Sequence, residues 1–354
     1  MNRKYLIPFL LFVFVNLLFG MYAGLGRMGW TSAFLQGYLH HGAIMVGGFL
    51  GTLIALEKVI PLRNKFLLVV PALSAASIVF LWSGNFTGGV SLLISASIGL
   101  MVVYGVYLYR QPEIYMWLML GSAACLFIGN VVLLSREFYP MALPWWMAFL
   151  LFTIVSERLE LSKFLPVTKN QKILLIGFIG LFITGILTAF HGIGNHLSGA
   201  SLVLVSVWLL RHDVVRINLR KKGLTRFSGV ALLSGYLALL LTGVLFIALP
   251  DTAFAYDALV HTFFIGFVFA MIFAHGPIIL PGVVGFMVKP YHPVLYVPLA
   301  LLQLSLLLRL SADLGLVDFS LQLVSGYLSA ISILLYFATV VTVMVKSLRH
   351  AKAT

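Results

Sequence analysis

The sequence predicts an all-α integral membrane protein with about twelve transmembrane helices. Its composition is the first observation behind this prediction. Hydrophobic residues make up 61% of the 354 residues, charged residues make up only 9%, and the mean hydropathy is +1.07. A water-soluble domain carries roughly a quarter charged residues, so this chain has too few charges to cover a surface that faces water. Lipid must solvate much of its exterior, and the bilayer is the first partner that we expect.

Apolar segments of membrane-spanning length are the second observation. A helix needs roughly 20 apolar residues to cross a bilayer. Twelve segments qualify, at approximately 5–24, 37–57, 66–82, 89–109, 114–134, 143–162, 172–190, 197–212, 227–249, 258–280, 293–310 and 321–345. The first resembles a signal peptide, but it lacks an A-x-A cleavage site and its apolar run is longer than usual. We expect it to be retained as the first helix of a single membrane domain, 1–354.

The distribution of basic residues is the third observation. With the N-terminus placed in the cytoplasm, all of the 23 Lys and Arg residues except Arg27, Arg136 and Arg309 fall in cytoplasmic segments. Basic residues gather in the short cytoplasmic loops of membrane proteins. The pattern predicts a bacterial-type cytoplasmic membrane protein with both termini inside. The net charge of +13 is then mainly a topology signal, and we expect no nucleic-acid partner. Binding of anionic lipid by the 211–226 loop is a secondary interpretation.

A short pattern recurs in helices two, six and ten. Each copy has a small residue, then Phe, then seven mostly apolar residues, then Glu or His. The copies are GFLGTLIALE ending at Glu57, AFLLFTIVSE ending at Glu157 and GFVFAMIFAH ending at His275. Because these helices are four apart in order, the pattern predicts three four-helix units in a pseudo-threefold arrangement, 1–110, 111–222 and 223–354. Chance similarity is the alternative, since Phe and small residues are abundant.

The shared polar position of the pattern has two interpretations. Glu57, Glu157 and His275 lie at the inner ends of their helices, and each glutamate is followed by a basic residue. The favoured interpretation is an interfacial cluster held by salt bridges. The alternative is a proton entry point or a second metal site. Glycines near the first copy likewise allow either close helix packing or the close approach of a flat cofactor, and packing is favoured.

Histidines are the best candidates for chemistry. Nucleotide-binding, nucleophile-elbow and HExxH motifs are missing from the sequence, so no enzyme class is indicated. Five of the nine histidines lie at the predicted outer face: His40, His41, His191, His196 and His261. Ionisable groups inside membranes are expensive and usually functional, and neutral imidazole is a common metal ligand. We expect His41 and His261, which open helices two and ten, to ligate haem b, with His40 as a neighbouring candidate. His191 and His196 are weaker metal candidates, for copper.

Helix order and histidine placement resemble subunit I of the haem-copper oxidases, in which helices two and ten hold a low-spin haem. The catalytic centre of that family is not matched, because helix six has no histidine and helix ten lacks a paired H-x-H. The chain more closely resembles the NnrS family of twelve-helix membrane proteins associated with haem, copper and nitric oxide stress. The likeness rests on Gly48, Phe49, Leu50 and Thr52 in helix two, and on His261, Gly266 and Met271 in helix ten. The early H-E pair of NnrS proteins is replaced by His40-His41-Gly42.

The resemblance implies a haem-binding and copper-binding membrane protein that acts in electron transfer or in handling nitric oxide. A redox partner would then be expected, and the haem would be non-covalent because the sequence has no C-x-x-C-H motif. A secondary transporter of a small solute or ion is the alternative, supported by helices that Gly and Pro interrupt near His275 and Pro281. A structural or assembly factor without a cofactor is the third hypothesis.

The charge asymmetry predicts a topology that reporter fusions can test. A reporter fused near Asn218 should be cytoplasmic, and one fused near Asp251 should lie on the other side of the membrane. Alkaline phosphatase and fluorescent-protein fusions at the two sites measure this. Finding both sites on one side would overturn the twelve-helix topology.

Overall fold

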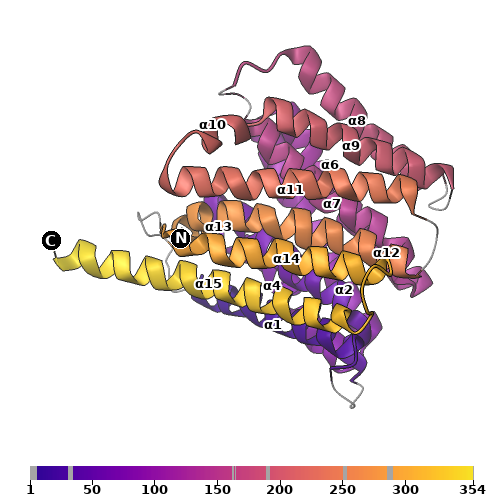
Figure 1. Cartoon of the computed structure of the whole chain (residues 1–354). Coiled ribbons are helices and arrows are strands. Elements are labelled where there is room, and N and C mark those ends of the chain that lie inside the picture. The colour runs from indigo at the N-terminus through magenta and orange to yellow at the C-terminus, as the bar shows by residue number, and fades with distance from the viewer. Residues whose placement is uncertain are drawn as a thin grey trace. The chain divides into compact units, whose positions relative to one another are not determined.

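The computed structural model describes most of the chain, namely residues 6–30, 35–161, 163, 165–188, 192–249, 253–284 and 290–353. Every regular element in these ranges is helical (Figure 1). Twelve helices in the described ranges are long and apolar enough to cross a membrane, as the sequence predicted. The chain divides into two compact units, residues 1–157 and 158–354.

The first unit contains the first six spans, four of them formed by single helices. These are α1 (Ile7–Arg27), α5 (Phe86–Arg110), α6 (Ile114–Arg136) and α7 (Tyr139–Leu161), whose last turn belongs to the second unit. The second span is built from η2 (Gln36–His40), α2 (His41–Ala43), η3 (Ile44–Gly51), α3 (Thr52–Val59) and η4 (Ile60–Leu62). The third joins η5 (Lys65–Leu68) to α4 (Val69–Trp82).

The second unit contains the other six spans. Its helices are α8 (Lys169–Leu187), α9 (Ile193–His212), the short α10 (Val215–Leu219), α11 (Gly223–Ala248), α14 (Tyr296–Asp313) and α15 (Leu321–Ala353). The tenth span is built from α12 (Ala253–His261), η7 (Thr262–Phe269) and α13 (Ala270–Val284), and η8 (Pro293–Leu295) precedes α14.

Several helices begin a few residues before the apolar runs that predicted them, and in α5 and α8 the added first turn carries a polar cap. The Asn85 side chain accepts a hydrogen bond from the Gly88 N–H at 2.9 Å and so caps α5. Thr168 and Gln171 form a reciprocal capping box at the start of α8. Such caps satisfy backbone N–H groups that have no partner within the helix. A hydropathy pattern does not include these polar residues.

Glycines set the closest approaches between helices. A Cβ added at Gly199 of α9 would lie 2.6 Å from the Gly243 carbonyl oxygen of α11, and the reverse substitution meets the same distance. In the first unit, the space beside Gly47 is filled by Leu93, and the space beside Gly48 by Asn16. The structure therefore supports the packing role of these glycines.

Two spans contain a π-helical segment, in which the backbone hydrogen bonds reach one residue further than in an α-helix. These segments are η3 in the second span and η7 in the tenth, each eight residues long. His41 lies three residues before η3, and His261 immediately precedes η7. Long π-helical segments are rare and are frequently found at functional sites. The sequence pattern did not reveal them.

The three spans that share the recurring pattern are the most buried of the twelve. The buried share of their apolar windows is 67% for the second span, 72% for the sixth and 61% for the tenth, whereas the other nine range from 22% to 56%. Phe49, Phe149 and Phe267, which occupy the same place in the pattern, are each at most 1% exposed. The pattern predicts such burial for these three helices. The division into three four-helix units stays a prediction.

Two prolines interrupt the backbone hydrogen bonds of α13, and a tyrosine hydroxyl replaces one of the missing donors. Pro277 has no N–H to donate to the Phe273 carbonyl one turn earlier. The Tyr336 hydroxyl of α15 donates to that carbonyl at 3.0 Å, and the Tyr336 ring stacks on the Phe273 ring. Gly276 makes room for this hydroxyl, since a Cβ there would lie 2.4 Å from it. A carbonyl without a partner would be costly in a membrane.

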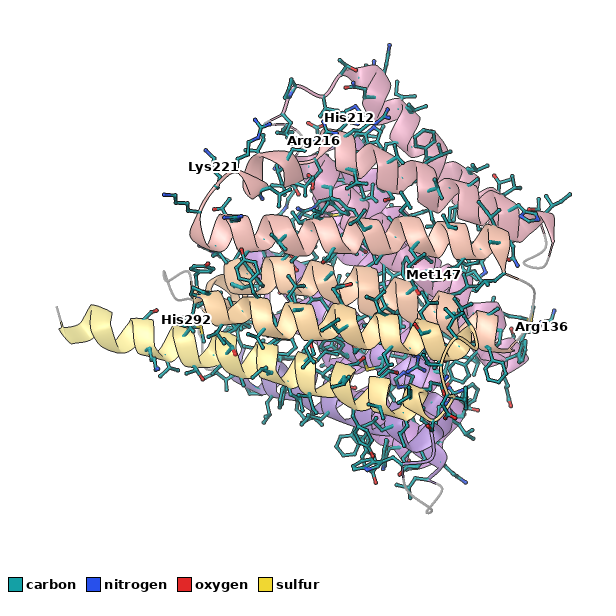
Figure 2. All side chains as sticks on the ribbon, in the orientation of Figure 1. Arg136, Met147, His212, Arg216, Lys221 and His292 are labelled. Carbon is teal, nitrogen blue, oxygen red and sulfur yellow. The ribbon has the colours of Figure 1, made fainter. Side chains whose placement is uncertain are left out.

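A basic segment connects α9 to α11. Figure 2 shows His212, Arg216 and Lys221 gathered around α10. The Lys and Arg residues of this segment are exposed, whereas Val215 and Asp213 are buried. α10 lies close against α11 at Gly229, where a Cβ would lie 2.9 Å from the Asn218 Cβ. The loop that carries the largest share of the predicted cytoplasmic charge, with six Lys and Arg residues, is therefore an ordered structure. Its lipid-binding role stays a prediction.

Replacing Gly243 by Leu should destabilise the second unit. The added side chain would collide with the backbone of α9, and overpacking of this kind costs about 1–3 kcal/mol. Unfolding by titration with a denaturing detergent in mixed micelles measures the loss in free energy of unfolding. Gly177→Leu is the matched control, because nothing lies within 4 Å of a Cβ added at that position. Equal stability of the two variants would contradict the close packing of α9 and α11.

Candidate functional site

His41 is held by the first helix of its unit. Its Nδ1 lies 2.7 Å from the Gly20 carbonyl oxygen in α1. A carbonyl can only accept, so Nδ1 carries the proton, and the lone pair of the neutral ring is on Nε2. Gly24 allows this arrangement, because a Cβ there would lie 2.9 Å from the His41 ring. Metal-ligating histidines usually donate their second ring nitrogen in this way.

His40 is oriented by different helices from its neighbour. Its Nδ1 lies 2.9 Å from the Tyr139 hydroxyl of α7, and its ring stacks on Phe86 of α5 with centroids 5.4 Å apart. A hydroxyl can donate or accept, so this bond leaves the tautomer of His40 open. The two adjacent histidines therefore differ in environment, which the sequence alone did not distinguish. The His41 ring has a defined lone-pair position, and the His40 ring does not.

His261 donates its Nδ1 proton to the residue one turn earlier. Nδ1 lies 2.9 Å from the Asp257 carbonyl oxygen and 3.2 Å from its carboxylate Oδ1. The lone pair of neutral His261 is therefore on Nε2, as in His41. A carboxylate partner also makes a histidine a more basic ligand. His41 and His261 thus present the same ring nitrogen for coordination.

A polar network surrounds Asp257, and the sequence analysis missed it. Arg309 of α14 donates two hydrogen bonds to the Asp257 carboxylate, at 2.8 and 3.0 Å. Gln322 of α15 donates to Asp257 at 3.3 Å and to Asp313 at 2.7 Å. The available signal was Arg309 itself, one of three basic residues outside the predicted cytoplasmic segments. The network fixes the orientation of the carboxylate that faces His261.

The weaker metal candidates are not brought together. His191 lies outside the described residues, and His196 is exposed at the start of α9. In the part of the chain that the structure describes, no group of three or more His, Cys, Asp or Glu side chains could hold a metal ion. A haem with two axial histidines does not need such a group, so this finding leaves the haem prediction untested. Copper at His191 and His196 stays a prediction.

The polar position of the repeat forms an ion cluster in the first unit. Lys58 Nζ lies 2.9 Å from Glu57 Oε1 and 2.6 Å from Glu157 Oε1. The Tyr107 hydroxyl of α5 donates to the Lys58 carbonyl at 2.8 Å. One lysine therefore joins the second span to the sixth. This geometry supports the salt-bridged interpretation of Glu57 and Glu157.

His275 belongs to a separate network in the second unit. Its Nδ1 donates to the Met271 carbonyl at 2.7 Å, and its Nε2 is hydrogen-bonded to the Arg158 guanidinium. Arg158 is 4% exposed and lies beside the Tyr236 hydroxyl of α11. That hydroxyl donates to Asp213 Oδ2 at 2.6 Å. Four ionisable side chains from distant parts of the sequence therefore form one chain of contacts, in which His275 is half-buried and the other three are buried, and the pattern around His275 did not indicate it.

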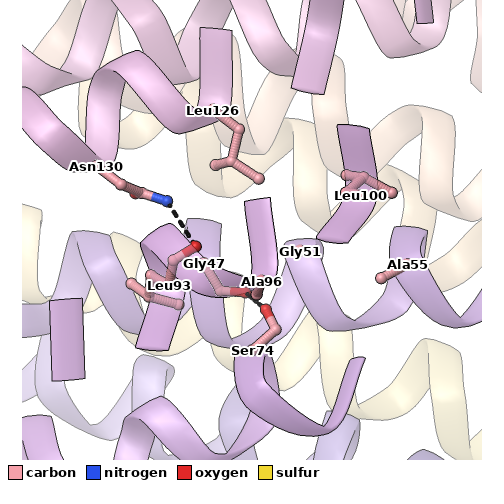
Figure 3. Close-up of a pocket in the computed structure, with 9 residues that line it drawn as sticks. All are labelled: Gly47, Gly51, Ala55, Ser74, Leu93, Ala96, Leu100, Leu126 and Asn130. Carbon is pink, nitrogen blue, oxygen red and sulfur yellow. Dashed lines mark hydrogen bonds between the residues drawn. The ribbon is translucent and has the colours of Figure 1, made fainter. Parts of the chain in front are cut away.

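A small cavity lies beside η3 in the first unit (Figure 3). It leaves about 10 Å³ for the centre of a water molecule, which is about the room that one water needs. Ser74 donates to the Gly47 carbonyl of the π-helical segment at 2.8 Å, and Asn130 donates to the Leu93 carbonyl at 3.2 Å. These polar lining groups suit a single water molecule. The cavity is far too small for a porphyrin.

The fold and these buried polar groups define a class: a multi-pass α-helical membrane protein with ionisable networks inside its spans. The chain belongs to the DUF8744 family, described as a domain of unknown function, whose profile matches residues 6–345. No curated protein and no solved structure matches the chain. The likeness to NnrS proteins and haem-copper oxidases stays a prediction.

Lys58→Met should destabilise the protein by about 1–3 kcal/mol. The variant leaves two partly buried carboxylates without their shared cation, and the remaining exposure keeps the loss below the 3–5 kcal/mol of a fully buried pair. Thermal unfolding in detergent measures it. The loss should shrink at acidic pH, where protonation removes the carboxylate charges. Lys221→Met, at an exposed position, is the control, and equal losses for both variants would contradict the bridging role.

Proposed function

We propose that the protein is a haem-binding membrane protein that acts in electron transfer or in nitric oxide-related handling, with His41 and His261 as the axial ligands of a haem b. The proposal extends the resemblance to NnrS proteins and oxidases. One observation carries it: the second and tenth spans repeat the same local arrangement. In each, a histidine donates its Nδ1 proton to a backbone carbonyl and lies just before an eight-residue π-helical segment, three residues before η3 for His41 and immediately before η7 for His261.

The donor set fits a haem iron. Axial histidines bind iron through a ring nitrogen that carries a lone pair, and both rings have theirs on Nε2. Both second nitrogens have acceptors, as ligating histidines usually require. The carbonyl that accepts from His261 lies in the same helix, as it does for His275, whereas the carbonyl that accepts from His41 lies in another helix. The His41 contact is therefore the more specific support.

The glycines after each histidine do not support the proposal. Leu93, Asn16 and Ala238 occupy the spaces beside Gly47, Gly48 and Gly266. These glycines leave no room for a porphyrin beside them, in agreement with the packing interpretation of the sequence. The ligand assignment therefore depends on the histidines alone.

A haem held by two histidines would supply one-electron transfer, since both axial positions are taken by protein. The residues of this chain would orient the ligands. Gly20 and Asp257 hold the two rings, and Arg309 holds the Asp257 carboxylate. A donor or acceptor of electrons would be the expected partner. The cytoplasmic membrane with both termini inside is the proposed location.

A secondary transporter is the second candidate. The observation that favours it is α13, where two prolines interrupt a span beside the half-buried His275 and the buried Arg158. Interrupted helices near buried polar groups are typical of transporter binding sites.

An absorption spectrum of the protein purified from haem-replete cells tests the proposal. We expect a Soret band with the features of low-spin haem. His41→Ala or His261→Ala should abolish the low-spin signal, because each removes one axial ligand. His292→Ala is the matched control and should keep it, since His292 Nδ1 only caps η8. A wild-type protein without a Soret band would overturn the haem proposal and favour the transporter.

A further inference from the structure

We propose that His275 is a proton-binding site of the second unit, linked by hydrogen bonds through Arg158 and Tyr236 to Asp213 near the predicted cytoplasmic surface and coupled to a movement of Arg158. The site is independent of the proposed haem ligands. It lies wholly among described residues of the second unit. Its ligand is a proton taken from water at the end of α9.

The hydrogen bonds fix the direction of each donor in the present state. The carboxylate of Asp213 accepts from the Tyr236 hydroxyl. The Met271 carbonyl can only accept, so His275 Nδ1 carries a proton. Arg158 has no acceptor atom, so it must donate to His275 Nε2. His275 is therefore neutral here, and its only basic nitrogen faces a cation.

Two buried atoms of the described residues, one a hydrogen-bond donor and the other an acceptor, have no hydrogen-bond partner in this arrangement. Among the described residues, no hydrogen-bond partner reaches Arg158 Nε or Asp213 Oδ1. Their residues are only 4% and 5% exposed. Leaving a buried charged group incompletely paired costs several kcal/mol. Arg158 Nε is a donor and Asp213 Oδ1 an acceptor, so each is the partner that the other lacks, and the Tyr236 hydroxyl touches both residues.

Protonation of His275 moves Arg158 from the imidazole ring of His275 to the carboxylate of Asp213. A proton added at Nε2 turns that nitrogen into a donor, and the hydrogen bond from Arg158 breaks. Two adjacent positive charges then repel each other. Arg158 moves toward Asp213, whose carboxylate forms an ion pair with the guanidinium. The step adds one proton to the unit and changes no covalent bond other than the new N–H bond.

The surroundings of His275 offer few other charges. Arg158 reaches it from α7 and Tyr236 faces Arg158 from α11. Tyr336 of α15 binds the backbone carbonyl of Phe273 in α13. Asp213 lies behind Tyr236, at the end of α9 next to the exposed basic segment. A proton would therefore enter from the end of the unit that the charge asymmetry predicts to be cytoplasmic.

Movement of α13 would follow from the same step. Pro277 and Pro281 interrupt the backbone hydrogen bonds directly after His275. A helix interrupted in this way bends more easily than a regular one. Proton binding at His275 is therefore placed where a change in charge can alter the tenth span.

Solid-state NMR of the full-length protein in lipid bilayers, with ¹⁵N-labelled histidine, tests the proposal. The His275 signals are those missing from the His275→Gln variant. They should change from the neutral tautomer at pH 8 to imidazolium at pH 5. Asp213→Asn removes the carboxylate that receives Arg158 and should weaken proton binding at His275 about tenfold, the effect of one opposite charge at close range.

Matched variants separate the site from general effects. Asp318→Asn removes an exposed carboxylate in the loop between α14 and α15 and should leave the His275 titration unchanged. If Asp213→Asn does not fold, Tyr236→Phe carries the test, because it removes the hydroxyl that joins Asp213 to Arg158. His275 signals that stay neutral down to pH 5 in a folded protein would overturn the proposal. Equal titrations in the Asp213 or Tyr236 variant and the Asp318 variant would also overturn it. The Soret band of His275→Gln reports separately on the haem proposal.

Discussion

The exclusion of water from the bilayer is the constraint on which the rest of this structure depends. Inside the hydrocarbon region, each backbone and side-chain polar group must find its partner within the protein. The structure meets this demand locally. Tyr336 binds the carbonyl that Pro277 leaves open, Ser74 binds a carbonyl of the π-helical segment η3, and Tyr107 binds the Lys58 carbonyl. Helices that depart from regular geometry are thus tolerated where a neighbouring side chain completes their hydrogen bonds.

The same constraint explains where charges occur. Lys58 lies between two glutamates, Arg309 donates two hydrogen bonds to Asp257, and Arg158 lies between His275 and Tyr236. Each cation joins different spans of its unit. Compared with apolar packing, such ion pairs add little to the free energy of unfolding. Removing one partner nevertheless destabilises the protein strongly, because it leaves a buried charge unpaired. Their presence inside the spans therefore points to function as well as to structural specificity.

Glycine has the packing role that the sequence analysis favoured. Close contacts at Gly199 and Gly243 join α9 to α11. Neighbouring side chains occupy the space beside the glycines that follow His41 and His261. Without a hydrophobic driving force between helices in lipid, van der Waals contact at short distance holds them together. The three spans with the recurring pattern are also the most buried. The recurring pattern therefore marks the most buried helices, and its glycines contribute to their close packing.

The sequence by itself determined the twelve spans and the all-helical class. Apolar length and charge spacing are local properties, and the lipid environment turns them directly into helices. Only the tertiary structure decided which ring nitrogen of His41 carries its proton, because the Gly20 carbonyl belongs to another helix. It also decided the pairing of Asp257 with Arg309 and of Asp213 with Tyr236. These partners lie 52 and 23 residues apart, so they meet only when helices pack. The π-helical segments are likewise invisible to hydropathy, because they depend on backbone hydrogen bonding and not on which residues are apolar.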